Sequence, residues 1–260
     1  MNGKPDYGNW VPKKLLALLW GAAAVSTCLL AANLLLFKVK LLTVLLAILS
    51  AVFLLYALYM QILHRSFSFE GGNLMSKIHG FVLSRLPWDG KGSLLDIGCG
   101  SGALTIRAAK KFPKGTFTGL DYWGVEWDYA KEMCEKNAQL EGVPGIEFIK
   151  GDATALPFED GTFDAAVSNF VFHEVRTCKD KRQLVKEGIR VVKKGGCFAF
   201  HDLFEKKSLY GDMKSLIAEL KAEGVSQIYY EPHTEDQSFI PGYVSNPLML
   251  YNLGILYGVK

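Results

Sequence analysis

The chain has 260 residues, of which 50% are hydrophobic and 21% charged, so it is not a disordered chain and can form one large domain or two modest ones. The formal net charge is +3, but the first 63 residues hold five lysines and a single acid, which leaves 24 basic and 25 acidic residues in the rest. This nearly neutral body argues against nucleic acid as a partner, because nucleic-acid-binding domains carry a basic surface.

The chain opens with a short tail, residues 1–14, followed by two uncharged stretches of 23 residues each, 15–37 and 41–63. A helix of that length is roughly 34 Å long and spans a hydrocarbon core of roughly 30 Å. A cleaved signal peptide is the alternative for the first stretch, but its apolar part is longer than usual and a second one follows directly. We therefore expect a transmembrane hairpin.

The connection between the two stretches is only three residues, 38–40, so the helices must be antiparallel and both termini must face the same compartment. Lysines and arginines outside the hairpin outnumber the two lysines in its loop, which places the termini in the cytosol by the positive-inside rule. The sequence thus predicts an integral protein of the cell membrane, in contact with the lipid bilayer, whose body lies on the cytoplasmic side.

Residues 64–92 form the expected juxtamembrane linker, with Gly71-Gly72 as a break and an amphipathic helix after it. Residues 93–260 then alternate short apolar runs with helical stretches, a pattern typical of a parallel sheet built from βα units. We expect strands near 93–97, 116–120, 146–149, 163–168, 196–201, 226–230 and 253–259. Helices are expected near 102–112, 126–140, 180–193 and 208–223.

A glycine-rich turn follows the first of these strands, in the run Asp96-Ile97-Gly98-Cys99-Gly100-Ser101-Gly102. Glycines allow close approach of the backbone to a ligand, and the following helix presents free N–H groups. Taken alone, the turn also fits an ordinary strand–helix connection or a dinucleotide-binding site.

Further polar residues fall at the ends of the next strands, where one nucleoside-like ligand needs them. Asp121 ends the second strand, and a carboxylate there can accept hydrogen bonds from both ribose hydroxyls. Gly151-Asp152-Ala153 follows the third strand, where Asp152 can accept from an exocyclic amine and the Ala153 N–H can meet a ring nitrogen. Each feature has a plainer alternative, a solvated acid or a common Gly-Asp turn.

Two more segments complete the set: Leu156-Pro157-Phe158 with Phe163-Asp164 before the fourth strand, and Lys193-Lys194-Gly195-Gly196 before the fifth. In this order the motifs resemble the class I S-adenosylmethionine-dependent methyltransferases, most closely the branch with quinone-biosynthesis C-methyltransferases and small-molecule methyltransferases. The resemblance covers the chain from about Gly71 to its end. It implies an α/β fold of the Rossmann-like type, with a seven-stranded, mostly parallel sheet, helices on both faces and an antiparallel last strand.

The resemblance also implies a cofactor, S-adenosyl-L-methionine, and roles for residues of this sequence. Asp96, Gly98, Cys99, Gly100 and Gly102 belong to the turn that meets the methionine part of the cofactor. Asp121 would hold the ribose, with Tyr122 against the adenine face. The adenine would be read by Gly151, Asp152 and Ala153, and Asn169 would lie at the amino acid end.

Methyl transfer from a sulfonium is an in-line displacement, so the enzyme mainly aligns the reactants and excludes water. If the acceptor must lose a proton, His173 is the first candidate base, because it lies just beyond the fourth strand. His201-Asp202, at the end of the fifth strand, is a second candidate pair. A histidine that only caps or packs locally is the alternative for His173.

A hydrophobic small-molecule acceptor is expected, such as a lipid, a quinone-like compound or a thiol, because the body follows a membrane hairpin. The apolar segment from Phe239 to Leu256 could line its pocket or face the membrane. No metal is expected, since the five cysteines, Cys28, Cys99, Cys134, Cys178 and Cys197, lack the spacing of metal ligands.

Two other functions remain open at this point. Tyr210 and Lys214 have the spacing of the short-chain dehydrogenase pair, although the glycine pattern and the place in the chain do not fit, and we expect them to be neighbours on a surface helix. A membrane-tethered protein that binds the cofactor without transferring a methyl group is the non-enzymatic alternative.

Overall fold

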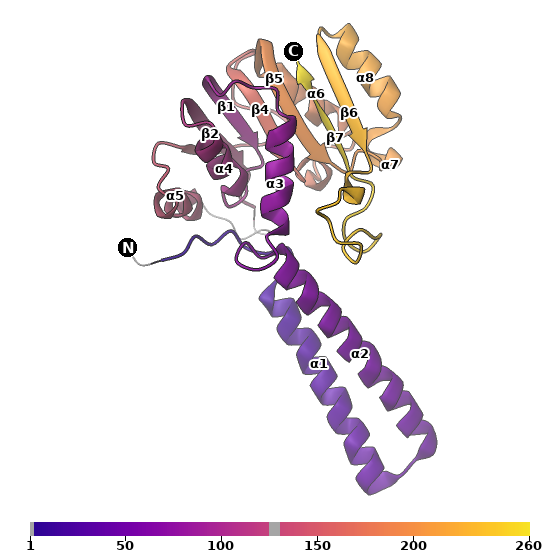
Figure 1. The fold of residues 1–260 in the computed structure, drawn as a ribbon. Helices are drawn as coiled ribbons and strands as arrows, with labels where there is room; N and C mark the ends of the chain where they lie inside the picture. Colours follow the sequence, from indigo (N-terminus) through magenta and orange to yellow (C-terminus); the bar gives the residue numbers. More distant parts are fainter. Residues whose placement is uncertain (1–2, 125–130) are drawn as a thin grey trace. The chain divides into compact units, whose positions relative to one another are not determined.

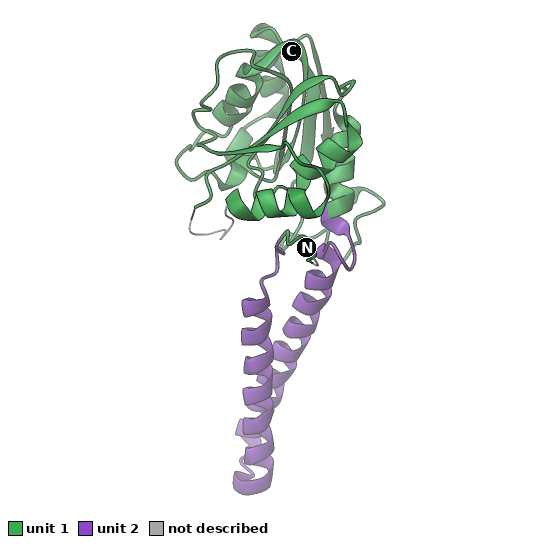
Figure 2. Cartoon of the chain, turned by 90° about the vertical axis from the view of Figure 1, so that its left-hand side faces the viewer, with its two compact units in different colours: residues 1–7, 76–260 green, residues 8–75 purple. Residues whose placement is uncertain are grey.

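The computed structural model describes residues 3–124 and 131–260. The chain divides into two compact units, one made of residues 1–7 and 76–260 and the other of residues 8–75 (Figure 2). The predicted third helix near 126–140 is described only from Lys131, so the part at 126–130 lies outside the described residues.

The smaller unit is an antiparallel pair of long helices. Helix α1 covers Lys13–Ala32 and continues as a π-helical turn, Asn33–Phe37, and helix α2 covers Lys40–Phe67. Both are long and apolar enough to cross a membrane, with mean hydropathy of 2.1 and 2.7 in their most apolar windows. Small residues such as Ala23 and Ala57 are buried, whereas many large apolar side chains, such as those of Leu35 and Leu55, are exposed.

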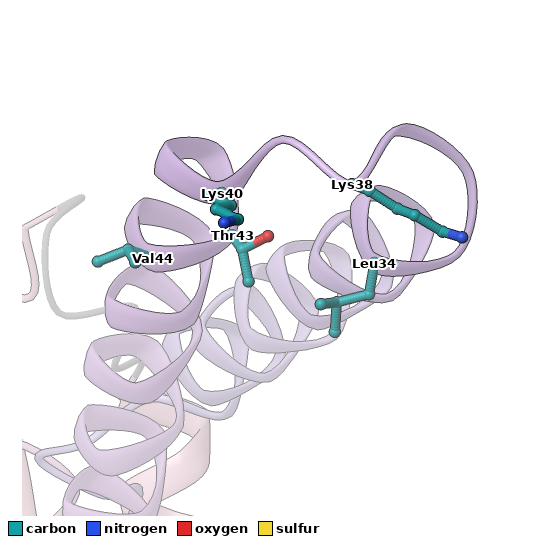
Figure 3. Close-up of a pocket in the computed structure, with 5 residues that line it drawn as sticks. All are labelled: Leu34, Lys38, Lys40, Thr43 and Val44. Carbon is teal, nitrogen blue, oxygen red and sulfur yellow. The ribbon is translucent and has the colours of Figure 1, made fainter.

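The connection between α1 and α2 is closed by its own hydrogen bonds. Lys38 adopts a left-handed conformation with φ of 54°, and the Asn33 side-chain amide donates to the Val39 carbonyl at 3.1 Å and to Thr43 Oγ1 at 2.8 Å. An open pocket beside this turn is lined by Leu34, Lys38, Lys40, Thr43 and Val44 (Figure 3). All five lining residues belong to the smaller unit, at or beside the connection of its two helices.

The larger unit is built on a seven-stranded sheet with the order β3-β2-β1-β4-β5-β7-β6 (Figure 1). Its strands are β1 Gly92–Ile97, β2 Gly115–Asp121, β3 Glu147–Lys150, β4 Phe163–Asn169, β5 Val192–Asp202, β6 Gln227–Pro232 and β7 Gly254–Val259. Strand β7 pairs antiparallel with β5 and β6, and the pairs among β1 to β5 are parallel. The predicted fold class is therefore confirmed, including the antiparallel last strand.

Helices cover both faces of this sheet. They are α3 Leu74–Arg85, α4 Ala103–Lys111, α5 Lys131–Leu140, α6 Arg182–Arg190, α7 Lys207–Tyr210 and α8 Met213–Ala222, with 3₁₀ turns at Phe172–Glu174 and Thr234–Asp236. Adjacent strand residues point to opposite faces: Leu94 packs with α3 and α4, and Leu95 packs with α6 and α8. This alternation explains why β1 reads as a continuous apolar run.

One sequence expectation is wrong. The helix expected near 208–223 is broken after Tyr210, because Gly211 has φ of +66° and the Asp212 side chain accepts a hydrogen bond from the Ser215 N–H, at 3.0 Å, and so begins α8. Tyr210 and Lys214 thus lie on different helices, and Tyr210 is fully buried rather than on a surface helix. Tyr210 and Lys214 therefore do not share a helix face, as a dehydrogenase pair with this spacing would.

Candidate functional site

The candidate site lies at the carboxyl ends of the central strands β2, β1, β4 and β5. The chain moves outward from β1 through β2 to β3 on one side, and through β4 to β5 on the other. The order reverses between β1 and β4, which is the point where open α/β sheets leave a crevice for a ligand.

The glycine turn after β1 adopts a backbone shape that other residues rarely take. Gly98, Gly100 and Gly102 have φ of +75°, +57° and +79°. A Cβ atom added to Gly98 would come within 2.3 Å of the Val171 side chain, which follows β4. The turn therefore packs its bare backbone directly against a residue that follows the neighbouring strand.

Asp121, at the end of β2, holds this turn in place. Its Oδ2 accepts a hydrogen bond from the Gly100 N–H and its Oδ1 accepts one from the Trp123 N–H, both at 2.8 Å. The Trp123 indole N–H returns a bond to the Gly100 carbonyl at 3.0 Å. A carboxylate has about four acceptor positions, so the half-buried Asp121 keeps capacity for two hydroxyl donors.

Trp123 is a site residue that the sequence analysis missed. Its φ of +45° is unusual for a bulky residue and is held by the two bonds to Asp121 and Gly100. The sequence gives no signal for it, because a tryptophan after a strand-end acid has no spacing pattern of its own.

Asp96, inside β1, is buried below the turn. Thr105 in α4 donates a hydrogen bond to its Oδ2 at 2.6 Å. Burial raises the pKa of Asp96 to about 7, and the bond from Thr105 opposes that rise. Burial also raises the pKa of the Cys99 thiol in the turn itself. These two groups thus support the turn from the interior.

The adenine-side candidates lie at the ends of β2 and β3. The Gly151 N–H donates to the Asp121 carbonyl at 2.9 Å, so the two predicted elements are joined. The Asp152 carboxylate accepts the Thr154 N–H at 2.8 Å, while Ala153 is buried. The Tyr122 ring is 64% exposed, with the Lys150 ammonium 5.6 Å from its centre.

Asn169, the last residue of β4, is tied to the interior by His201. The two side chains share a hydrogen bond of 2.9 Å, and the other ring nitrogen of His201 bonds Thr234 at 2.8 Å. Burial lowers the pKa of His201 to about 4, so the ring is neutral near pH 7. His201 thus positions Asn169 and does not pair with the carboxylate of Asp202.

Asp202 pairs with His173 instead. The His173 Nδ1 lies 2.7 Å from Asp202 Oδ1, and the Phe172 N–H donates to Asp202 Oδ2 at 2.8 Å. The His173 Nε2 lies 3.1 Å from a carboxylate oxygen of the exposed Glu174. Burial alone would lower the pKa of His173, but the bonds to Asp202 and Glu174 outweigh it and raise the pKa to about 9.

The structure thus brings the predicted residues together in two groups. The glycine turn, Asp121 and Gly151 form one connected network, and His173 with Asp202 forms a second at the ends of β4 and β5. Within the described parts of the chain, no cluster of three histidine, cysteine or acidic side chains is placed to hold a metal ion.

Comparison with known proteins gives matches over this part of the chain. Residues 95–200 match the family model described as "Methyltransferase domain". The demethylmenaquinone methyltransferase of Lactococcus lactis is 35% identical over 105 residues, 40% of this chain and 39% of that protein. The phthiotriol/phenolphthiotriol dimycocerosates methyltransferase of Mycobacterium tuberculosis is 31% identical over 113 residues, 42% of this chain and 37% of that protein. The matched part thus spans about two fifths of these relatives.

Among solved structures, the [4+2]-cyclase SpnF is similar with a TM-score of 0.53, 20% identity, and coverage of 71% of this chain and 80% of that chain. This likeness supports the fold alone, and a cyclase with this fold shows that the fold does not by itself set the reaction.

Proposed function

We propose that this chain, whose residues 95–200 match a methyltransferase domain, is a class I S-adenosylmethionine-dependent methyltransferase that transfers a methyl group to a small hydrophobic acceptor beside a membrane. The observation that carries the proposal is the hydrogen-bonded network of the glycine turn, Asp121 and Gly151 at the switch point of the sheet. The cofactor is S-adenosyl-L-methionine, and the chain's own residues fit it in three places.

The first fit is the glycine turn, where Gly98, Gly100 and Gly102 have positive φ and carry no side chains, so that backbone N–H groups can approach a ligand closely. The second is Asp121, whose charge and free acceptor positions suit the two ribose hydroxyls. The third is the group Gly151, Asp152 and Ala153 with the exposed Tyr122, which offers an acceptor, a backbone donor and an aromatic face to a purine ring. Asn169 and Asp96 complete the set at the amino acid end.

When bound, the cofactor supplies an electrophilic methyl group on sulfur. The protein's part is to align the acceptor with that methyl and to keep water out. Cys99 contributes packing within the turn and no nucleophile, since burial keeps its thiol protonated at neutral pH.

His173 is the residue we assign to proton transfer. Asp202 is buried behind its Nδ1, so this nitrogen carries a proton. Below the raised pKa of about 9, Nε2 also carries a proton and donates it to Glu174 at the rim, so the ring becomes a base only when Nε2 has lost that proton. An acceptor hydroxyl that displaces Glu174 from Nε2 would give its proton to the neutral ring. His201 and Asp202 then act through their neighbours, His201 on Asn169 and Asp202 on His173, and neither is the base itself.

The hydrophobic acceptor is supported by the relatives and by the sequence around the domain. The relatives' names specify demethylmenaquinone, a quinone, and phthiotriol or phenolphthiotriol dimycocerosates, which are lipids; both are hydrophobic substrates. The two apolar helices are long enough to anchor the chain in a bilayer. The excess of lysine and arginine outside the hairpin supports a cytosolic place for the body, where the cofactor is made. The uncharged segment 241–259 exposes Tyr243, Leu248 and Tyr251 and would face such an acceptor or the membrane surface.

Calorimetry on the detergent-solubilised full chain tests the cofactor assignment. S-adenosylhomocysteine and S-adenosylmethionine should bind, whereas NAD(H) and NADP(H) should give no heat of binding. Tight binding of a nicotinamide cofactor without binding of S-adenosylhomocysteine would overturn the proposal in favour of an oxidoreductase. Binding without methyl transfer to any acceptor would leave the tethered binding protein as the function.

A further inference from the structure

The first described residues of the chain, 3–7, pack on the sheet domain and belong to its compact unit. In Figure 1 this indigo segment passes α5, and its contacts are with that helix and with the glycine turn. The Tyr7 ring packs beside the apolar cluster of Cys99, Cys134 and Phe148, and its hydroxyl donates to Glu141 at 3.0 Å. We call residues 3–7 the N-terminal strap.

Asn137, on α5, joins the strap to the turn. Its Oδ1 accepts the Asp6 N–H at 2.8 Å, and its Nδ2 donates to the Asp6 carbonyl at 2.7 Å and to the Ser101 carbonyl at 3.0 Å. The side chain thus copies the two-way pairing of a neighbouring β-strand and adds a third bond. Asn137 is only 1% exposed, so these partners satisfy a buried amide that would otherwise be costly.

Ser101 is held by the strap from its other side as well. Its hydroxyl donates to the Tyr7 carbonyl at 3.1 Å, so both polar ends of this buried residue are fixed by the strap and by Asn137. Ser101 lies between Gly100 and Gly102, two residues with positive φ. A glycine-rich backbone loses much conformational entropy when it is fixed. If contacts within the protein fix it in advance, this entropy loss no longer reduces the affinity for the ligand.

We propose that the N-terminal strap sets the shape of the cofactor turn, with Asn137 as the positioning residue that transmits it through Ser101. This inference rests on the proposed function, because the turn is taken to bind S-adenosylmethionine. Asp121 and Trp123 fix the turn at Gly100, and the strap fixes it at Ser101. The residues that lead into the apolar helices therefore also contribute to cofactor affinity.

The test uses the full chain and three changes: deletion of residues 1–7, Asn137→Asp and Asn137→Ala. The deletion should weaken S-adenosylhomocysteine binding about tenfold, equivalent to about 1.4 kcal/mol. Asn137→Asp should weaken it more than Asn137→Ala, because a carboxylate oxygen would replace Nδ2 and face the Asp6 and Ser101 carbonyls. Ser226→Ala is the matched control, since it removes a similar serine bond, to the Val259 carbonyl, outside the site.

Two readouts separate positioning from general destabilisation. The KM for S-adenosylmethionine should rise while the KM for the acceptor stays unchanged, and amide hydrogen exchange at residues 98–104 should speed up in the deletion variant. The exchange readout needs no cofactor, so unchanged protection in the deletion variant overturns the strap's role even if the proposed function fails. Failure of the unmodified protein to bind S-adenosylhomocysteine counts against the proposed function alone. Wild-type affinity in the deletion variant would also overturn the inference.

Discussion

Replacing Asp121 by asparagine tests the centre of the site with a change of almost no volume. The two carboxylate oxygens accept the Gly100 and Trp123 N–H groups, both at 2.8 Å. In Asp121→Asn one of these oxygens becomes an NH₂ group, so one backbone donor meets another donor. The ribose hydroxyls would also lose a charged acceptor.

Hydrogen bonds to a charged group contribute about 1.5–3 kcal/mol each. Asp121 is half-buried, so the lower part of this range applies, about 1.5–2 kcal/mol for the lost bond. We therefore expect the affinity for S-adenosylhomocysteine to fall about 10–30-fold. Asp121→Ala should lose both backbone bonds and weaken binding by about 1–3 kcal/mol.

Isothermal calorimetry on the two variants measures this directly. Asp89→Asn is the matched control, because Asp89 carries the same charge before β1 and is exposed, with no bond to the turn. Affinity within twofold of the unmodified protein for Asp121→Asn would refute the role of this carboxylate in shaping the turn and holding the ribose.

Three further predictions concern the other parts of the site and the helices. His173→Ala should lower turnover about 10²–10⁴-fold with cofactor affinity unchanged. Turnover of the unmodified protein should rise with pH up to about 9, because only the neutral His173 ring accepts a proton. Glu174→Gln should move this rise to lower pH, because it removes one of the carboxylates that stabilise the protonated ring. An unmoved pH profile in that variant would exclude His173 as the titrating base. Gly98→Ala should destabilise the fold by about 1–3 kcal/mol in denaturant titrations, because φ of +75° and the Val171 side chain both oppose a Cβ atom. The full chain should stay with membranes after carbonate washing, and its two termini should report the same side in reporter fusions, whereas opposite sides would remove the hairpin.

The pairing of His173 with Asp202 and Glu174 also makes the free energy of unfolding depend on pH, in a direction that the raised pKa sets. The pKa of His173 in the folded protein, about 9, lies above its ordinary value of 6.5. The pairing with Asp202 and Glu174 therefore contributes fully to stability below about pH 6.5, and this contribution is lost as the pH rises through about 9.

The sheet was predictable because its strands are short apolar runs bounded by glycines and acids. β1 and β4 begin and end within one residue of the predicted limits, and the reversal of β7 followed from the family resemblance. The split between α7 and α8 was missed, because Tyr210 and Lys214 fit a single helical period and only the backbone of Gly211 shows the break. Burial of Tyr210 depends on tertiary packing, which a local pattern does not encode.

The site was less predictable than the sheet. Strand-end position was enough to select Asp121 and His173 as candidates, but the partner of Asp202 depends on the 3₁₀ turn that carries His173 beside it. The strap was beyond sequence reasoning: residues 3–7 have no apolar period, and Asn137 reads as an ordinary polar residue of a surface helix. The hydrogen-bond partners of Asn137, Ser101 and Asp6, lie 36 and 131 positions away in the chain.

Transfer of a labelled methyl group tests the central claim most directly. The purified full chain is incubated with S-adenosylmethionine labelled in its methyl group and with a membrane extract, and the products are separated into organic and aqueous phases. The account predicts label in an apolar, extractable product, with little label when Asp121→Asn or His173→Ala replaces the unmodified protein. Label only in water-soluble products would contradict the hydrophobic acceptor, and no transfer of label by a protein that binds S-adenosylhomocysteine would contradict the methyltransferase itself.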